Sequence, residues 1–437
     1  MPARTQRNEL VRSPTMRLVV AAMGALLAVT IVAPTSWASY TPPDGVLFNR
    51  PADAGSTAAK YRIRNHTDAT IRSVPRGGTI RVVQYAINFR SSADALIAAH
   101  RRGVSVRVLV DDRHNYNAHR RLKRALGTKT SNRSYFYVCK NGCRIGAGGA
   151  LHSKFLTFTS AGSKRDIVMV SSANLTGPGA TWGWNDNVTW SGNRAWYLSF
   201  VDVFSQMARD RKVAKPYIIA RSGPYSAYFM PQRTANLSED VIAKALSNVR
   251  CTGANGGAGI GGRTVVRVGM FGMIGDRGMY LARKLRSLDN QGCRVEVLLA
   301  KPSRKVIKEL RRPGPNGGVT VHDTRYDRDG DGRPDKYIHA KYMMISGRYG
   351  GDRSFWTVFT GSQNWFPRSQ THDDEVVVQL RTRSAFKTYN RHFLDIWYNH
   401  SYLRPNKPLN QYSNFGQFGL YSADDPWPYL GPLPESE

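Results

Sequence analysis

The sequence is poor in acidic side chains, and it has no long apolar run after its first 33 residues. No later segment is therefore long enough to span a bilayer as a helix, because about 20 apolar residues are needed. The four cysteines are not spaced as in a zinc ribbon or finger, which argues against a structural zinc site. The glycine-rich stretch 252–262 contains no lysine, so it does not match a phosphate-binding P-loop, and we interpret it as a loop or linker.

The shortage of acidic residues leaves a large excess of positive charge. The 437 residues include 63 Lys and Arg against 31 Asp and Glu, a formal net charge of +32. The positive electrostatic field of such a protein attracts polyanions and anionic surfaces. A basic surface also aids solubility, and it suits a protein that functions beside an anionic cell wall. The apolar content of 41% and the 21 Tyr exclude a disordered chain, and the length predicts two lobes or domains.

Residues 1–38 have the pattern of an export signal. Arg12 and Arg17 precede the uncharged run 18–33, and Ser36-Trp37-Ala38 offers small residues for cleavage. We expect a cleaved signal peptide and a secreted protein, with an uncleaved membrane anchor as the alternative. Residues 39–437 would keep a net charge of +29, because the leader removes four Arg and one Glu.

The cysteines fit an oxidising compartment. Cys139 and Cys143 flank the turn sequence Lys140-Asn141-Gly142, which favours pairing in a small loop. Cys251 and Cys293 would then pair within the second half of the chain. Three connectivities remain open from the sequence alone.

Two motifs of the same composition carry the candidate chemistry. Each has a histidine and a lysine two residues apart before an apolar run, and a serine and an asparagine after the next apolar run. They comprise His152, Lys154, Ser172 and Asn174 in the first half, and His339, Lys341, Ser362 and Asn364 in the second. Lysine supplies charge to an anion, serine and asparagine supply directional hydrogen-bond donors, and histidine serves as nucleophile or proton donor near neutral pH.

The two halves resemble one another beyond these motifs. Residues 102–109 match residues 291–298 at an offset of 189, the motif histidines are 187 apart, and the predicted closing helices near Phe204 and Phe393 are 189 apart. An internal duplication explains these nearly equal offsets. Strands predicted at 79–87, 104–110 and 135–138 alternate with helices predicted at 93–102 and 194–211, which is typical of an α/β lobe.

We therefore predict an α/β fold of two similar lobes, each a mixed β-sheet flanked by helices, related by a pseudo-twofold axis that brings both motifs to one cleft. The predicted divisions are 1–38 for the signal peptide, 39–235 and 236–400 for the lobes, and 401–437 for a C-terminal tail.

The paired histidine-lysine motif with its serine and asparagine resembles the phospholipase D superfamily, over the mature chain to about His400. That resemblance implies one active site between the lobes and hydrolysis of phosphodiesters through a phosphohistidine, with no cofactor required. The family pattern also has an aspartate five residues after each lysine. Thr159 and Ser346 occupy those positions here, and we expect the later Asp166 and Asp352 to be solvated loop carboxylates.

In the family an acidic residue after the asparagine orients a histidine, and Glu375 fits that position in the second copy. We align Asn187 with it in the first copy, with Asp186 as a neighbouring carboxylate. As a hypothesis, His152 attacks phosphorus while Glu375 holds His339 protonated as the acid. Lys154, Lys341, Asn174, Asn364, Ser172 and Ser362 would hold the phosphate oxygens.

An acidic loop precedes His339. Asp327, Asp329, Asp331 and Asp335 occupy positions one, three, five and nine of a calcium-type loop, with glycine at six, but Ile338 stands at position twelve in place of glutamate. The hypotheses are a structural calcium site and a solvated Asp-Gly turn.

Three functions fit these observations. The first is a secreted phospholipase D-type hydrolase acting at a phospholipid or membrane surface, and the second is an exported nuclease bound to nucleic acid. The third is a non-catalytic polyanion-binding protein. We expect a monomer, with Trp182, Trp184, Trp365 and Phe366 either lining the cleft or lying in the core.

Overall fold

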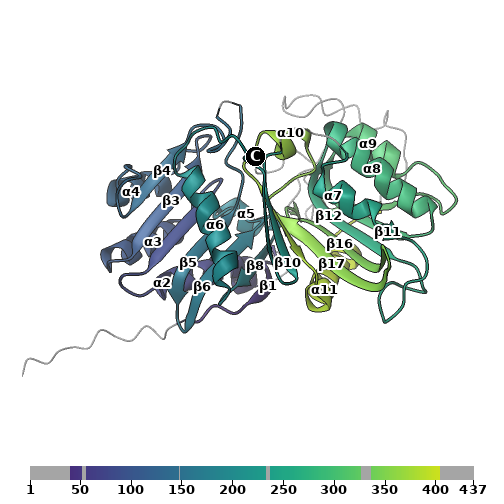
Figure 1. The fold of residues 1–437 in the computed structure, drawn as a ribbon, viewed down its shortest axis with the longest axis horizontal. Helices are drawn as coiled ribbons and strands as arrows, with labels where there is room; N and C mark the ends of the chain where they lie inside the picture. The colour runs from purple at the N-terminus through teal and green to yellow at the C-terminus, as the bar shows by residue number, and fades with distance from the viewer. Residues whose placement is uncertain (1–39, 52–55, 147, 233–236, 326–335, 404–437) are drawn as a thin grey trace, which may run out of the picture. The chain divides into compact units, whose positions relative to one another are not determined.

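The computed structural model describes residues 40–51, 56–146, 148–232, 237–325 and 336–403. Within these ranges the chain forms two large mixed β-sheets with helices on their faces, as Figure 1 shows. The signal peptide predicted at 1–38 and most of the predicted tail lie outside the described residues. Among the described helices, none has the length and apolar character of a membrane span.

The first sheet has seven strands in the order β1-β8-β6-β5-β2-β3-β4. Strands β2, β3 and β4 are parallel and the other pairings are antiparallel. Its strands are β1 (Gly45–Phe48), β2 (Thr79–Gln84), β3 (Ser105–Asp111), β4 (Tyr135–Cys139), β5 (Phe155–Ala161), β6 (Lys164–Ser171) and β8 (Asp186–Trp190). The helices of this half are α1 (Thr57–Lys60), α2 (Arg62–Arg72), α3 (Arg90–Arg101), α4 (Asn117–Leu126), α5 (Gly177–Thr181) and α6 (Arg194–Met207).

The second sheet repeats the same order, as β18-β17-β16-β12-β13-β14, with β10 and β9 added at the β18 edge. Its strands are β9 (Ile218–Ser222), β10 (Tyr225–Phe229), β11 (Val249–Arg250), β12 (Val265–Met273), β13 (Arg294–Pro302), β14 (Thr320–Asp323), β16 (Lys341–Tyr349), β17 (Asp352–Gly361) and β18 (Val376–Leu380). The helices are α7 (Val241–Ser247), α8 (Gly275–Asn290), α9 (Arg304–Leu310), α10 (Pro367–Thr371) and α11 (Arg383–Asn399). The repeated order confirms the predicted α/β fold of two similar lobes.

Local sequence explains these elements. Each of the nine residues of β12 is buried, which is why this strand lacks the apolar-polar alternation of a half-exposed strand. Asn193 caps α6 by accepting a hydrogen bond from the Trp196 backbone N–H at 3.0 Å, and Thr382 caps α11 in the same way through Ala385. Helix α6 ends at Met207, four residues before the predicted end.

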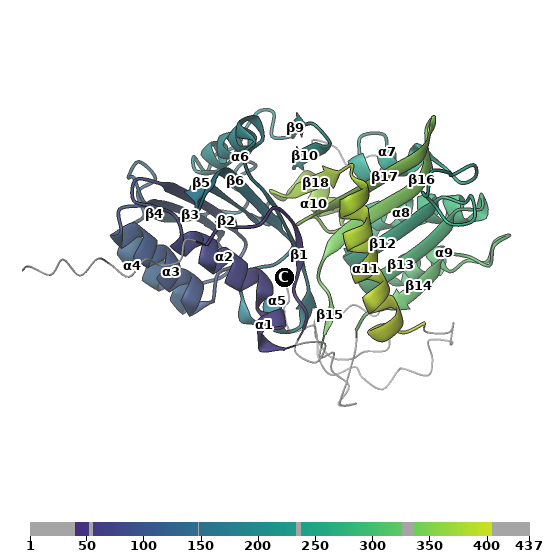
Figure 2. The same cartoon turned by 90° about the horizontal axis from the view of Figure 1, so that it is seen from below.

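Three apolar cores support the sheets. One lies between the first sheet and α3 and α4, and another between the second sheet and α7, α8 and α9. The largest includes residues of both sheets together with α6 and α11, so the lobes share a central core. Figure 2 shows α6 and α11 on the opposite faces of their sheets from α3 and α8 respectively.

Two further pairings connect the halves of the chain. Strand β7 (Gly183–Trp184) of the first half pairs in parallel with β15 (Tyr337–Ile338), directly before His339. Strands β9 and β10 precede the lobe boundary predicted at residue 235, yet β10 pairs with β18. The chain therefore joins the second sheet at Ile218, before residue 235.

Candidate active site

A carboxylate from the second lobe holds His152. This histidine lies just before β5 and is 7% exposed, and its Nδ1 is 2.8 Å from Oε1 of Glu375, just before β18. The other carboxylate oxygen of Glu375 accepts a hydrogen bond from Ser362 Oγ. Burial alone would raise the pKa of Glu375, but His152, Lys154 and these hydrogen bonds bring the pKa below its usual value. An ionised Glu375 can only accept, so His152 carries a proton on Nδ1.

An amide from the first lobe holds His339. The His339 ring is fully buried, and its Nδ1 is 2.7 Å from Oδ1 of Asn185. The same amide oxygen accepts a hydrogen bond from Ser172 Oγ at 3.2 Å. The two histidines therefore have related settings, in which His152 faces a charged acceptor and His339 a neutral one.

This arrangement corrects two predictions. Glu375 contacts His152, whereas the prediction that it holds His339 is wrong. The counterpart of Glu375 is Asn185 and not Asn187, because Asn185 follows Asn174 at the interval by which Glu375 follows Asn364. Equal spacing in the two copies is the sequence signal that identifies Asn185. The side chain of Asn187 lies two residues further along, within β8, and donates to Thr189 Oγ1 at 3.1 Å.

Backbone contacts hold each histidine motif against the opposite lobe. The N–H groups of His152 and Ser153 donate to the carbonyl oxygen of Asp374 at 3.0 and 2.7 Å. In the same way, the N–H groups of His339 and Ala340 donate to the carbonyl oxygen of Trp184 at 3.0 and 2.7 Å. Each anchoring carbonyl directly precedes the residue that orients the histidine ring. Both motifs are therefore built across the junction of the lobes, with contacts that run in both directions.

Each motif lysine is buried beside its histidine. Lys154 Nζ donates to the His152 carbonyl oxygen at 2.9 Å and lies 5.2 Å from the centre of the Tyr85 ring. Lys341 Nζ is 3.0 Å from His339 Nε2 and 5.2 Å from the centre of the Phe271 ring. An ammonium group can only donate, so Nε2 of His339 is the acceptor in this contact. Two buried cations can hold an anion strongly, because the protein interior screens charge less than water does.

The two asparagines complete the set. Asn174 follows β6 and Asn364 follows β17, and both side chains are buried. The Gly272 N–H donates to Asn364 Oδ1 at 3.2 Å, and Arg277 Nη1 donates to the Asn364 carbonyl oxygen at 2.8 Å. With its oxygen engaged, the Asn364 amide has its NH2 group left to donate to an anion.

The positions of the missing family aspartates lie outside this constellation. Thr159 Oγ1 accepts the Thr79 N–H at 2.9 Å, and Ser346 Oγ accepts the Gly259 N–H at 2.9 Å. These hydroxyls serve as acceptors for backbone groups that lead into neighbouring strands. Asp166 pairs with Arg194 at 2.7 Å and Asp352 accepts the Ser354 N–H at 2.8 Å, so neither carboxylate contacts the histidines.

Asp186 has a different role from the one considered for it. Its Oδ2 accepts hydrogen bonds from Thr360 Oγ1 and, at 2.5 Å, from Tyr389 Oη, and both donors belong to the second lobe. Burial raises the pKa of this carboxyl, against hydrogen bonds from Ser172, Thr360 and Tyr389 and the charge of Lys341. Asp186 thus joins the lobes beside the candidate site.

The remaining predictions concern metals, cysteines and aromatics. The candidate calcium ligands Asp327, Asp329, Asp331 and Asp335 lie outside the described residues. In the part of the chain that the structure describes, no cluster of three or more His, Cys, Asp or Glu is arranged to hold a metal ion. The predicted disulfides Cys139–Cys143 and Cys251–Cys293 are confirmed, which excludes the zinc alternative. Of the four aromatics, Trp184 and Trp365 belong to the buried cores, and Trp182 and Phe366 are partly buried.

Comparison with known proteins agrees with this geometry. A family model described as "Cardiolipin synthase, PLD-like domain" matches residues 76–208 and again residues 263–397. No curated protein matches the chain.

Two solved structures share the fold at low sequence identity. The phosphatidylserine synthase of Haemophilus influenzae Rd KW20 has a TM-score of 0.57 and 12% identity, over 84% of this chain and 90% of the synthase. The polyphosphate kinase of Porphyromonas gingivalis has a TM-score of 0.50 and 16% identity, over 81% of this chain and 49% of the kinase. This chain thus spans about half the length of that kinase. The family model covers most of the sequence in two repeats, each with its histidine-lysine motif, and the chain therefore belongs to the phospholipase D-like family.

Proposed function

We propose that this protein is a secreted phosphodiesterase of the phospholipase D type, which hydrolyses phospholipid phosphodiester bonds through a phosphohistidine. The observation that carries the proposal is the reciprocal setting of His152 and His339. Each ring is oriented by a residue of the other lobe, and each has a buried lysine at its side. A phosphodiester needs such a set, since its anion must be neutralised while one group attacks and another protonates the leaving oxygen.

His152 is the nucleophile in this proposal. Attack by Nε2 forms an N–P bond and leaves positive charge on the imidazole, which the ionised Glu375 at Nδ1 stabilises. The carboxylate thus supports the attacking histidine and not, as first expected, the acid. The Ser-His-Asp hydrolases use a carboxylate in the same way to stabilise an imidazolium.

His339 is the acid and base of the second lobe. The acid role requires a second proton, on Nε2 of His339, when substrate is bound, with the Lys341 ammonium then donating to the phosphate instead of to Nε2. As the P–O bond to the leaving alcohol breaks, His339 gives that oxygen the Nε2 proton, and it later takes a proton from the water that attacks phosphorus and breaks the N–P bond. The neutral Asn185 keeps the His339 proton on Nδ1 without adding negative charge, which suits a ring that must release a proton from Nε2. Lys154, Lys341, Asn174 and Asn364 hold the phosphate oxygens as charge develops.

The choice of a lipid substrate draws on the names of two relatives, and the choice of a secreted protein draws on the leader and the disulfides. The matching family model carries the name of a cardiolipin synthase, and a structural relative is a phosphatidylserine synthase. Residues 1–38 have the pattern of an export signal, and two disulfides suit an oxidising compartment. The excess of 63 basic over 31 acidic side chains favours an exported nuclease as the second candidate, since phosphate contacts dominate affinity for nucleic acid.

Turnover assays separate these candidates. Purified residues 39–437 would be incubated with phosphatidylglycerol vesicles, phosphatidylcholine vesicles, single-stranded DNA and bis(p-nitrophenyl) phosphate. Release of a lipid head group supports the proposal, and cleavage of DNA alone favours the nuclease. Tight binding without turnover of any substrate would overturn both and leave a polyanion-binding protein.

Trapping the intermediate tests the roles of the histidines. p-Nitrophenol leaves without needing an acid, so a His339→Asn variant should still react with bis(p-nitrophenyl) phosphate but hydrolyse the product slowly. Mass spectrometry should then find a p-nitrophenyl phosphoryl group on the peptide containing His152. A His152→Asn variant is the matched control and should carry no label. Label on His339 in the His152→Asn variant would reverse the assignment.

A further inference from the structure

The loop that leads into the His152 motif begins with a disulfide. Cys139 ends β4, and its bond to Cys143 closes a loop of five residues, in which Asn141 adopts the left-handed φ of 61°. Asn is one of the few residues that adopt this conformation readily, so the sequence and the disulfide favour the same tight loop. Both cysteines are buried. The disulfide therefore sets the path by which the backbone reaches the next residue, Arg144.

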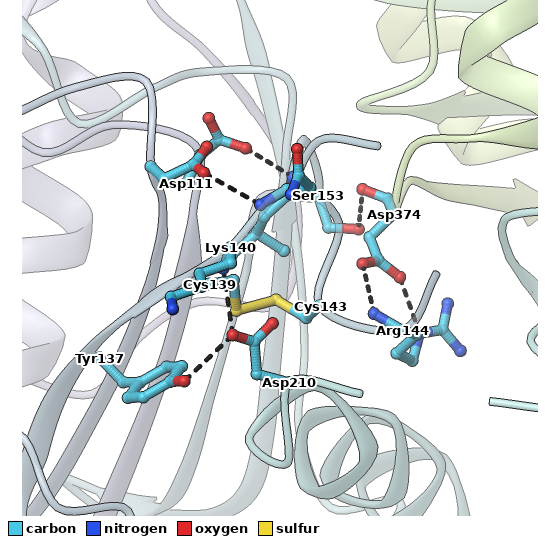
Figure 3. The surroundings of a disulfide bond; sticks show 12 residues. Asp111, Tyr137, Cys139, Lys140, Cys143, Arg144, Ser153, Asp210 and Asp374 are labelled. Atoms are coloured by element: carbon cyan, nitrogen blue, oxygen red, sulfur yellow. Dashed lines mark hydrogen bonds and ion pairs between the residues drawn. A yellow bond between two sulfur atoms is a disulfide. The ribbon is translucent and has the colours of Figure 1, made fainter. Parts of the chain in front are cut away.

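Arg144 forms a fully buried ion pair with the second lobe. Its side chain and that of Asp374 have no exposed surface, and Nε lies 2.8 Å from Asp374 Oδ1. The Arg144 backbone N–H also donates to Asp374 Oδ2 at 3.1 Å, and Cys143 donates a backbone hydrogen bond to the same carboxylate. Figure 3 shows the two side chains facing each other beside the disulfide. The carboxylate thus binds two consecutive residues, one of them a disulfide cysteine.

The rest of the guanidinium is fixed by backbone oxygens. Nη1 donates to the Pro216 carbonyl oxygen at 2.9 Å, and Nη2 donates to that of Met230. Asp210 holds the loop from the other side, because its carboxylate accepts from Tyr137 Oη at 3.0 Å and from the Lys140 N–H at 3.1 Å (Figure 3). Any side chain in place of Gly149 would clash with the His372 carbonyl oxygen, so the loop packs closely on the residues before Asp374.

Asp374 lies at the centre of the His152–Glu375 contact. Its carbonyl oxygen accepts the N–H groups of His152 and Ser153 and also Ser153 Oγ at 3.0 Å. The next residue is Glu375, whose carboxylate holds the His152 ring. One residue therefore positions both ends of this hydrogen bond, and Arg144 positions that residue.

We propose that the Cys139–Cys143 disulfide and Arg144 control assembly of the site, so that the enzyme is active only when this disulfide has formed. The inference rests on the function proposed above. Arg144 is a positioning residue, since it acts through Asp374 and touches neither histidine. A dithiol would switch the site off by passing two electrons and two protons to the S–S bond, giving two thiols while the dithiol becomes a disulfide. Activity would then be confined to the oxidising side of the membrane.

The two disulfides of the chain provide a matched comparison. Cys139→Ala/Cys143→Ala should lower kcat on bis(p-nitrophenyl) phosphate by about 100-fold, because small displacements of catalytic groups have effects of that size. Cys251→Ala/Cys293→Ala removes the disulfide that lies in the apolar core between the second sheet and α7, α8 and α9, and this variant should keep the wild-type kcat. The second readout is the low-field ring proton on His152 Nδ1, observed by NMR in protein with 15N-labelled histidine. It should vanish in the first variant and persist in the control.

Two outcomes would overturn the proposal. One is a Cys139→Ala/Cys143→Ala protein that keeps both its kcat and the His152 proton signal, and the other is an equal loss of both in the control. Should the first variant fail to fold, Arg144→Lys decides, because it keeps the disulfide and the charge but loses the planar fork. That variant should weaken the signal and lower kcat, and wild-type values in it would overturn the proposal.

The NMR signal of the His152 proton also distinguishes failure of the disulfide proposal from failure of the proposed phosphodiesterase function. A wild-type protein that shows the His152 proton but turns over no phosphodiester would refute the function alone. Sensitivity of that proton to the Cys139–Cys143 disulfide would still support the positioning role.

Discussion

At the scale of single residues, the two halves of the site differ in the acceptor that faces each histidine ring. Glu375 places a charged oxygen on the ring of His152, and Asn185 places a neutral oxygen on the ring of His339. The surrounding serine, lysine and asparagine residues are the same in both halves. We expect the proposed division of labour between the histidines to depend on this difference in charge.

Replacement of Glu375 by Gln tests that dependence. The amide oxygen can still accept from His152 Nδ1, but no negative charge remains to stabilise the phosphorylated ring. We expect kcat to fall by roughly 10²- to 10⁴-fold, the range for loss of assisted proton and charge transfer. Steady-state kinetics measures it, and the matched control is Glu309→Gln on α9, whose carboxylate pairs with Arg286 and Arg312 at 3.9 and 3.8 Å. An unchanged kcat in Glu375→Gln would contradict the role of the carboxylate.

Asp373 should make stability depend on pH. Burial and the charge of Glu375 raise its pKa to about 6, against His152 and Arg368. The folded state then binds a proton more tightly than the unfolded state, so this group's stabilisation is present below pH 4 and is lost as pH rises through 6. The loss amounts to roughly 3 kcal/mol for a shift of about two pKa units.

Urea unfolding at pH 4 to 8 checks this expectation. In Asp373→Asn, where residue 373 does not titrate, the free energy of unfolding should decline less between pH 4 and 6 than in the wild type, by the share that Asp373 contributes. If the free energy of unfolding depends on pH in the same way in both proteins, Asp373 has the same pKa in the folded and unfolded states, and the prediction is wrong.

At the scale of elements, strand order and strand ends build the site. Both sheets share the same order of six strands. The histidine-lysine motifs stand at the start of β5 and β16, which occupy equivalent places in the two sheets, beside β6 and β17 respectively. Apolar runs and helical spacing predicted these strands and the closing helices from sequence. The exact ends were less predictable, because they depend on caps and neighbours; α6, for example, stops at Met207.

Helix α8 supports the second asparagine through Arg277. This arginine forms a fully buried ion pair with Asp240 at 2.8 Å and also holds the Asn364 carbonyl oxygen. Arg277→Ala leaves a buried carboxylate without its cation, and we expect a loss of about 3–5 kcal/mol in the free energy of unfolding. Arg312→Ala, whose side chain is 64% exposed, should cost less than about 0.5 kcal/mol. Similar losses in the two variants, measured by urea denaturation, would contradict the structural role of Arg277.

At the scale of the whole molecule, neither half can build the site alone. Each histidine is oriented from the other half, and Asp186 joins β8 to Tyr389 of α11 at 2.5 Å. The largest apolar core takes residues from both sheets. We therefore expect the two halves to be stabilised together.

The net charge should act at the same scale. Residues 39–437 carry 59 basic against 30 acidic side chains, and this field should speed the encounter with anionic vesicles. We expect kcat/KM on phosphatidylglycerol vesicles to fall on the order of tenfold as ionic strength rises from about 0.05 to 0.5 M, with kcat unchanged. Phosphatidylcholine vesicles are the control and should show a weaker dependence. Equal salt dependence for both lipids would contradict electrostatic steering.

The sequence by itself determined which residues are candidates for the site and that the chain is duplicated. Repeated motifs identified His152, Lys154, Asn174 and their second-half counterparts, and equal offsets identified the duplication. The turn sequence between Cys139 and Cys143 favoured their pairing, and the structure decided among the three possible connectivities.

Only the tertiary structure decided which residues meet. His152 and Glu375 are 223 positions apart, and His339 and Asn185 are 154 apart. Both pairs cross between the lobes, so no local pattern records them, and a prediction made within one half assigned Glu375 to the wrong histidine. The Arg144–Asp374 contact was missed for the same reason, since burial of a charge pair depends on how two distant surfaces pack.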